Sequence, residues 1–221
     1  MAQKIEGDIT FTGAVRVGSI SLDAGNLTNS DIASTAAIDR SKLAQDTLQP
    51  FSIPLTDLRV HDAVQTVLPG TPATDDLGLD SGTFGTEAIH VTAGDLKAAG
   101  ATTRYARCKI ALPAEYDDAE TVNIRVVAKM ETTVADTTCT VDVEAYEVAN
   151  DLTVGADLCT TAATSMNSLT AANYDFTITA TSLEPGDELD VRIAIACNDG
   201  ATGTAVEPVI SSIKLLCDIK G

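Results

Sequence analysis

Apolar and polar residues alternate along seven segments in the second half of the chain. These segments read EAIHVTA, TRYARCKIALP, ETVNIRVVAKMETT, TCTVDVEAYEV, NYDFTITAT, DELDVRIAIACND and VISSIKLLCDIK. Successive side chains of a β-strand point to opposite faces, so each segment has one apolar and one polar face. That pattern is typical of antiparallel sheets packed face to face. We therefore predict an all-β protein in which residues 84–221 form an antiparallel, jelly-roll-like β-sandwich head, with room for an eighth strand near DLTVGADLC.

The alternation also predicts which residues of a segment share a face. In ETVNIRVVAKMETT, Val122, Ile124 and Val126 share one face, while Asn123 and Arg125 lie on the other. Between two of the segments, LEPGDEL places Pro and Gly next to each other, which suits the centre of a tight turn. The strands are thus expected to be joined by short turns.

The segment before the head has a different composition. Residues 46–86 include four of the seven prolines of the chain and many Gly, Asp and Thr residues. Such a mixture is typical of a connector that holds at most short strands. We predict that residues 46–83 connect the head to the N-terminal part of the chain.

Residues 1–45 are interrupted by glycines at positions 7, 13, 18 and 25. The strands between them are too short for an isolated sheet, and the helical turns expected near Thr28 and in DRSKLAQ are marginal alone. Winding of three copies, or docking on a larger surface, would stabilise this segment; a flexible terminus is the alternative. We predict an attachment and trimerisation segment whose contact residues are Ile9, Phe11, Val15, Val17, Ile32, Ile38, Arg40, Lys42 and Leu43.

Four of the five cysteines share the apolar phase of a predicted strand, and Cys159 does not. The four are Cys108, Cys139, Cys197 and Cys217. A buried free cysteine behaves as a small apolar residue, and the odd count without a CxxC spacing favours reduced, inert thiols. A bridge such as Cys139 to Cys159 is the alternative.

The chain carries 32 acidic and 14 basic residues, for a formal net charge of −18. This charge repels phosphate backbones and anionic lipid, so we expect no nucleic-acid or membrane partner. No apolar run approaches the length of a membrane span, and MAQKIEGD does not resemble a secretory signal. We expect synthesis in the cytoplasm.

Residues that could carry chemistry are few. His61 and His90 have no ligand partner at helical or metal-site spacing, and TDDLGLDSG lacks the alternating ligands and distal Glu of a calcium loop. Carboxylates near turns, such as Asp117 and Glu184, would need the aromatic walls of a glycosidase cleft, and only 4% of the chain is aromatic. We predict no enzyme activity, no cofactor and no metal.

Two phrases, NSDIAS and AAIDRSKLA, follow the glycine-punctuated repeats of residues 7–25. The whole segment resembles N-terminal segments of bacteriophage virion proteins, namely head fibres, capsid decoration (cement) proteins and some tail fibres. EPGDELDVRIAIACNDG and ISSIKLLCDI are similar to the jelly-roll heads of such fibres. The resemblance implies a homotrimeric structural protein that contacts the major capsid protein on the exterior of the virion, after assembly in the host cytoplasm.

Two functions remain open from the sequence. The chain is a capsid decoration or head-fibre protein, or it is the tip of a tail fibre that binds a receptor or host-surface glycan. The scarcity of aromatic residues favours the structural function.

Overall fold

The computed structural model describes residues 48–149, 151, 153–201 and 203–219, all within the compact unit Leu43–Gly221. The predicted attachment segment, residues 1–45, lies outside them. The described chain forms twelve strands and one short 3-10 helix, η2 (Leu55–Asp57). The strands are β1 (Leu48–Ile53), β2 (Arg59–Val60), β3 (Ala63–Val67), β4 (Gly78–Asp80), β5 (His90–Thr92), β6 (Thr102–Ala111), β7 (Val122–Met130), β8 (Thr138–Glu147), β9 (Thr164–Ser165), β10 (Ala172–Ile178), β11 (Glu188–Asn198) and β12 (Pro208–Asp218).

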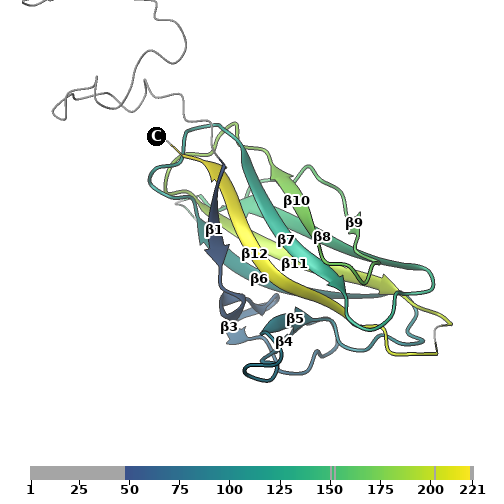
Figure 1. The fold of residues 1–221 in the computed structure, drawn as a ribbon. Helices are drawn as coiled ribbons and strands as arrows, with labels where there is room; N and C mark the ends of the chain where they lie inside the picture. The colour runs from purple at the N-terminus through teal and green to yellow at the C-terminus, as the bar shows by residue number, and fades with distance from the viewer. Residues whose placement is uncertain (1–47, 150, 152, 202, 220–221) are drawn as a thin grey trace, which may run out of the picture. The chain divides into compact units, whose positions relative to one another are not determined.

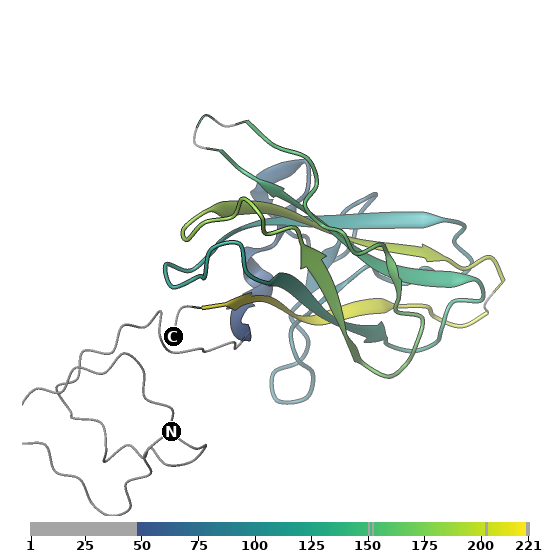
Figure 2. The ribbon, with the colours of Figure 1, turned by 90° about the horizontal axis from the view of Figure 1, so that it is seen from above.

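The strands form two antiparallel sheets. Sheet A has the order β10-β7-β12-β5-β4, with β1 also paired to β12, and sheet B has the order β3-β2-β6-β11-β8-β9. Figure 1 shows β12 running between β1 and β7, and Figure 2 shows the two layers from above. The predicted antiparallel β-sandwich is confirmed, and all seven predicted strands are present.

Strand pairing is nested in the manner of a jelly roll. β1 pairs with β12, β6 with β11, β7 with β10, and β8 with β9. The outermost pair in sequence thus joins the first and last described strands, and each inner pair lies within the one before it. Such pairing places alternate strands in the two sheets.

The inward faces of the two sheets form one apolar core. On β7, Val122, Ile124, Val126, Ala128 and Met130 are all at most 1% exposed, as the alternation predicts. Sheets that pack in this way bury one side of every strand and leave the other side polar.

The cysteines also follow their predicted phase. Cys108, Cys139, Cys197 and Cys217 are buried, Cys159 is half-buried, and all five are free thiols. Cys139 lies opposite Cys197 in the register of β8 and β11, rather than beside Cys159. Burial raises the pKa of the Cys108 thiol to about 12.

The region predicted as a connector contributes strands to the sandwich. β1 pairs over its full length with β12, and β2, β3 and β4 also join the sheets. Pro50 lies within β1. A proline has no backbone N–H, so in a central strand it would remove a hydrogen bond between strands. Because β1 is bonded on one side only, the missing N–H is tolerated there, and the boundary of the sandwich lies earlier in the chain than residue 84.

The turn predicted at Pro185 and Gly186 is present before β11. Asp187 N donates to Glu184 O at 3.2 Å, and Gly186 has a φ of 88°. This is the left-handed conformation that the third residue of a type II turn requires, and glycine adopts it without strain.

Candidate functional site

The nine residues predicted to contact the capsid or a second copy lie outside the described residues, so the structure places none of them. They are Ile9, Phe11, Val15, Val17, Ile32, Ile38, Arg40, Lys42 and Leu43. The described residues present a different candidate, on the outer face of sheet B.

A trough follows the middle strand of this face. Ala194 on β11 lies opposite Tyr105 on β6 and Asp142 on β8. The next outward position repeats the arrangement, with a small residue between two threonines (Thr103, Ala196 and Thr140). Small side chains on the middle strand between longer ones on its neighbours leave a floor with two walls, which we call the sheet B trough.

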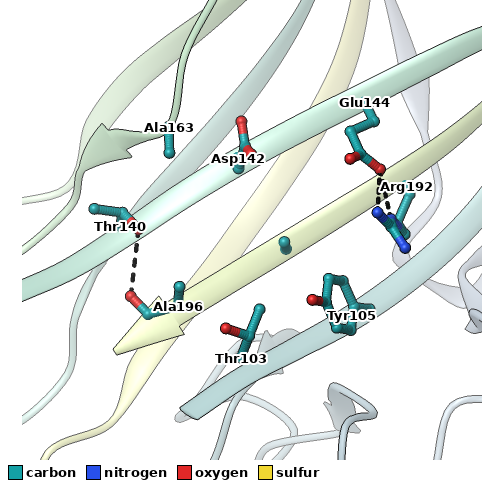
Figure 3. A pocket seen from close by; sticks show the side chains of 9 residues that line it. Thr103, Tyr105, Thr140, Asp142, Glu144, Ala163, Arg192 and Ala196 are labelled. Carbon is teal, nitrogen blue, oxygen red and sulfur yellow. Dashed lines mark hydrogen bonds and ion pairs between the residues drawn. The ribbon is translucent and has the colours of Figure 1, made fainter. Parts of the chain in front are cut away.

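The trough contains a hollow of about 150 Å³. Figure 3 shows its lining, with Ala163 standing opposite the β6 side chains beyond β8. The floor and Ala163 are apolar, while the walls carry hydroxyl, carboxylate and phenol groups. The hollow is therefore amphipathic.

An ion pair crosses the trough at one end of this hollow. Arg192 donates from Nε to Glu144 Oε2 at 2.6 Å and from Nη2 to the same oxygen at 2.5 Å (Figure 3). The guanidinium carbon also lies 4.8 Å from the centroid of the Tyr105 ring. These contacts hold the planar guanidinium in a fixed orientation between a carboxylate and an aromatic ring.

A second hollow, of about 250 Å³, continues the trough beyond this ion pair. It shares Glu144 and Arg192 with the first hollow and adds five other lining residues, His61, Arg107, Tyr146, Val154 and Asp190. From Asp190 to Ala196 the middle strand advances by six residues, which corresponds to about 20 Å. The two hollows lie along this stretch of β11, with the Arg192–Glu144 ion pair between them.

Arg107 and Asp190 form the base of the second hollow. Arg107 donates from Nε to Asp190 Oδ1 at 2.6 Å and from Nη2 to Asp190 Oδ2, so the pair is bidentate. The hydrogen bond to Asp190 raises the pKa of Arg107 further above its ordinary value. The pair fixes both side chains beneath the opening.

Asp142 is a wall residue whose ionisation is affected by its surroundings. Partial burial raises the pKa of the Asp142 carboxyl above its ordinary value, and the nearby charges of Glu144 and Asp157 add to this effect. The backbone N–H of Val143 donates to its Oδ1 at 3.0 Å, and the charge of Arg192 also opposes the shift. Among the described residues, no ion pair to this carboxylate is present.

A cluster of side chains that could ligate a metal ion lies at the second hollow. The cluster consists of His61, Asp75 and Asp76. Each can offer one ligand atom, and these atoms lie within 4.8 Å of one another.

A separate hollow of about 270 Å³ between β4, β5 and β12 is lined by further acids and His90. There, burial raises the pKa of the Glu207 carboxyl, and repulsion from Asp95 and Glu131 adds to the shift.

In TRYARCKIALP the alternation places Tyr105 and Arg107 on the polar face, but that alternation does not indicate the trough. The depth of the trough depends on Ala194 lying between β6 and β8, and the order of the strands in a sheet is set by tertiary structure. The small residues on the polar face of DELDVRIAIACND, Ala194 and Ala196, are the signal in the sequence that could have indicated the trough.

No helix among the described residues has the length and apolar character needed to span a bilayer. No family model matches the chain, and no curated protein sequence matches it.

Solved structures show a loose likeness of fold. The CBM22-1 xylan-binding domain of Xyn10C from Paenibacillus barcinonensis is 11% identical, with 66% of this chain and 82% of that chain covered and a TM-score of 0.38. The xylan-binding module CBM15 is 16% identical, with 79% and 100% covered and a TM-score of 0.43. A chain of the infectious bursal disease virus Gx strain is 12% identical, with 63% and 36% covered and a TM-score of 0.33. These likenesses are too loose to transfer a ligand or the role of a residue.

Proposed function

We propose that the sheet B trough binds a carbohydrate chain. The observation that carries the proposal is the amphipathic lining, in which the apolar floor of Ala194 and Ala196 lies between polar walls. A sugar ring has an apolar C–H face and a rim of hydroxyls that both donate and accept hydrogen bonds. The floor would contact the C–H face, and the walls would bind the rim.

The wall groups match a hydroxyl-rich ligand better than a strongly charged one. Asp142 and Glu144 accept hydrogen bonds, Arg192 donates them, and the threonine hydroxyls do both. A neutral polyol uses all of these groups at once. A nucleic acid would meet the two carboxylates and a chain with a net charge of −18, so its phosphates would be repelled.

A peptide bound by strand addition is a poorer fit to this face. Strand addition needs an open sheet edge, whose backbone groups lack partners. The floor of the trough is β11, which is hydrogen-bonded to β6 on one side and β8 on the other. A ligand in the trough must therefore be recognised by side chains, as sugars commonly are.

The test is affinity electrophoresis in gels that contain a soluble polysaccharide, with xylan, a mixed-linkage β-glucan and a bacterial surface polysaccharide as separate probes. We expect retardation by at least one probe. Ala194→Trp should abolish it, because the indole would fill the 150 Å³ hollow.

Ala172→Trp is the matched control. Ala172 is exposed on β10, at the edge of the opposite sheet, so the same substitution leaves the trough open. Equal retardation of Ala194→Trp and the parent chain, or equal loss in both variants, would refute a ligand in the trough.

We further propose that the sandwich is the head of a virion protein, attached as a homotrimer to the major capsid protein through residues 1–45. The support is the resemblance of residues 7–45 to phage attachment segments, together with the glycine spacing, which leaves only short strands between glycines. The glycan would then belong to a host surface, and the virion exterior would be the site of action. This proposal makes the chain a binding and structural protein rather than an enzyme.

Deleting residues 1–45 tests the attachment. The shortened chain should stay folded, keep its affinity for polysaccharide and lose its affinity for capsids, whereas Ile38→Asp with Leu43→Asp should weaken capsid binding in the full chain. Multi-angle light scattering should give the mass of a trimer for the full chain. Undiminished decoration of capsids by the shortened chain would show that residues 1–45 are not the anchor.

A further inference from the structure

We propose that His61, Asp75 and Asp76 form a binding site for one divalent first-row metal ion, for which Zn²⁺ is the probe. The sequence gives His61 no ligand partner at a recognisable spacing. The fold supplies two ligand partners, Asp75 and Asp76, because the turn that carries His61 packs against the loop that carries both aspartates.

Backbone hydrogen bonds fix the positions of the three side chains. His61 lies in the tight turn between β2 and β3, where Val60 pairs with Ala63. On the other side, Tyr105 N donates to Asp75 O at 2.7 Å, and Leu77 N donates to Tyr105 O at 2.9 Å. The aspartate loop is therefore attached to the edge of β6, next to the trough.

The turn before the aspartates is strained. Asp76 N donates to Ala73 O at 2.7 Å, and Thr74 has a φ of 44°, in the left-handed region. A residue other than glycine adopts this region at an energetic cost, and such residues concentrate at ligand clamps and other functional positions. Here the strained residue turns Asp75 and Asp76 toward the imidazole.

The distances suit an ion that is bound by the imidazole and one carboxylate, with the other carboxylate as hydrogen-bond partner of the ring. His61 Nε2 lies 3.6 Å from Asp75 Oδ2, and His61 Nδ1 lies 3.4 Å from Asp76 Oδ1. Two ligands bound tetrahedrally to Zn²⁺ at about 2.1 Å are about 3.4 Å apart. Each ring nitrogen faces a carboxylate, so one nitrogen can bind the ion while the N–H on the other donates to the second carboxylate, as metal-bound histidines usually do.

The charge of the group also favours a cation. A neutral imidazole has one N–H, so it can donate to one carboxylate while its other nitrogen binds an ion. The group then carries two negative charges that no cationic side chain pairs with among the described residues. Arg107 donates to His61 O at 3.4 Å, but its own charge is paired with Asp190.

The ligand set selects the type of ion. Imidazole nitrogen suits Zn²⁺ and its neighbours in the first row, whereas Ca²⁺ prefers six or more oxygen ligands. Side-chain exposure is 14% for His61, 20% for Asp76 and 49% for Asp75. The site is thus closed on the protein side and open to solvent at Asp75, where water would complete the coordination.

The ion would also stiffen one wall of the trough, and this consequence rests on the proposed function. The rings of His61 and Tyr105 have centroids 4.9 Å apart and planes at 40°. An ion on the imidazole fixes that ring, and with it the position of Tyr105 beside the floor. Chelation is then expected to weaken polysaccharide binding severalfold without abolishing it.

The test is equilibrium dialysis of the EDTA-stripped full chain against Zn²⁺, with bound metal measured by mass spectrometry and Ca²⁺ as the comparison. We expect one Zn²⁺ per chain at micromolar concentration and no stoichiometric Ca²⁺. His61→Ala and Asp76→Asn should each weaken Zn²⁺ binding at least tenfold. His90→Ala and Asp80→Asn, at residues that line the separate hollow between β4, β5 and β12, are the matched controls and should bind as the parent does.

Loading with Co²⁺ separates this site from the thiols. Nitrogen and oxygen ligands give visible d–d bands alone, whereas a cysteine ligand adds a strong near-ultraviolet charge-transfer band. A thiolate band, the absence of stoichiometric Zn²⁺ binding, or an equal loss in His61→Ala and His90→Ala would each overturn the site. Asp75→Asn, at a half-exposed position, provides a variant that should fold even if His61→Ala does not. Because dialysis needs no polysaccharide, its result stands whether or not the trough binds sugar.

Discussion

Replacing Asp142 with asparagine should weaken ligand binding while leaving the fold as stable as before, or more so. The carboxylate lies on the wall of the trough, and partial burial raises its pKa above the ordinary value. The folded protein therefore holds this proton more tightly than the unfolded chain does. The free energy of unfolding falls as pH rises from the ordinary aspartate pKa to the higher pKa of the folded protein. Above that pH, the charged carboxylate destabilises the fold. Asparagine keeps the shape and removes the charge, so the melting temperature at pH 7 should stay or rise.

The expected loss of affinity follows from the hydrogen bonds of the carboxylate. Asp142 Oδ1 accepts from Val143 N, which leaves acceptor capacity for a ligand hydroxyl. A hydrogen bond to a charged group contributes about 1.5–3 kcal/mol, and an open trough justifies the lower end of that range. At about 1.4 kcal/mol for a factor of ten, Asp142→Ala should lose about tenfold in affinity, and Asp142→Asn less, since its amide oxygen still accepts.

Isothermal titration calorimetry with the polysaccharide that retards the parent chain measures affinity, and scanning calorimetry measures stability. Asp175→Asn is the control, because Asp175 pairs with Arg125 at 2.6 Å on the outer face of sheet A. It should leave affinity unchanged and lower stability by at most about 1 kcal/mol, as exposed ion pairs do. A lower melting temperature with unchanged affinity in Asp142→Asn would mean that the residue is structural and would refute the reasoning.

Three further predictions concern the core. A thiol reagent should label Cys159 alone in the native protein and all five cysteines after denaturation; fast native labelling of three or more would contradict the strand phases. Phe176→Ala, at a fully buried position, should destabilise the sandwich by about 3–5 kcal/mol, which lowers the melting temperature by about 10 °C in scanning calorimetry. A change below about 1 kcal/mol would show that Phe176 is not part of the core. Burial raises the pKa of Tyr116 to about 12, and its hydroxyl donates to Glu120 O at 2.8 Å. The unfolded phenol ionises near 10, so stability should fall between about pH 10 and 12 in alkaline denaturation, and Tyr116→Phe should flatten that fall.

The strands of the head could be predicted from the sequence because alternation is a local signal. It places Val122 and Cys108 inside and Arg125 outside, and the structure agrees. β1 could not be predicted in the same way, since LQPFSI lies among prolines and its place in sheet A comes from pairing with residues 213–218 of β12. The edge position that tolerates Pro50 is a property of the assembled sheet.

The candidate site could not be predicted from the sequence, because it also depends on tertiary structure. The trough needs Ala194 between Tyr105 and Asp142, three residues that are brought together by the strand order of sheet B. The scarcity of aromatic residues in the sequence favours a structural function, but it does not bear on a trough whose walls act through hydrogen bonds. His61 likewise meets Asp75 through the packing of a turn on a loop, and no spacing in the sequence signals that contact.

The nested pairing of the strands determines when the sandwich can form during synthesis. Among the described strands, β1 emerges from the ribosome first. Its partner in sheet A is β12, about 160 residues later, and loops of that length close slowly. In sheet A, β12 lies between β1 and β7 and pairs with both. Until β12 is made, both strands expose unpaired backbone groups on that side. Nascent chains that stall before β12 would present these edges to one another and aggregate. The attachment segment proposed for residues 1–45 would therefore be available to its partners before the head that it carries is folded, and trimer formation at that stage would hold three unfinished heads at high local concentration.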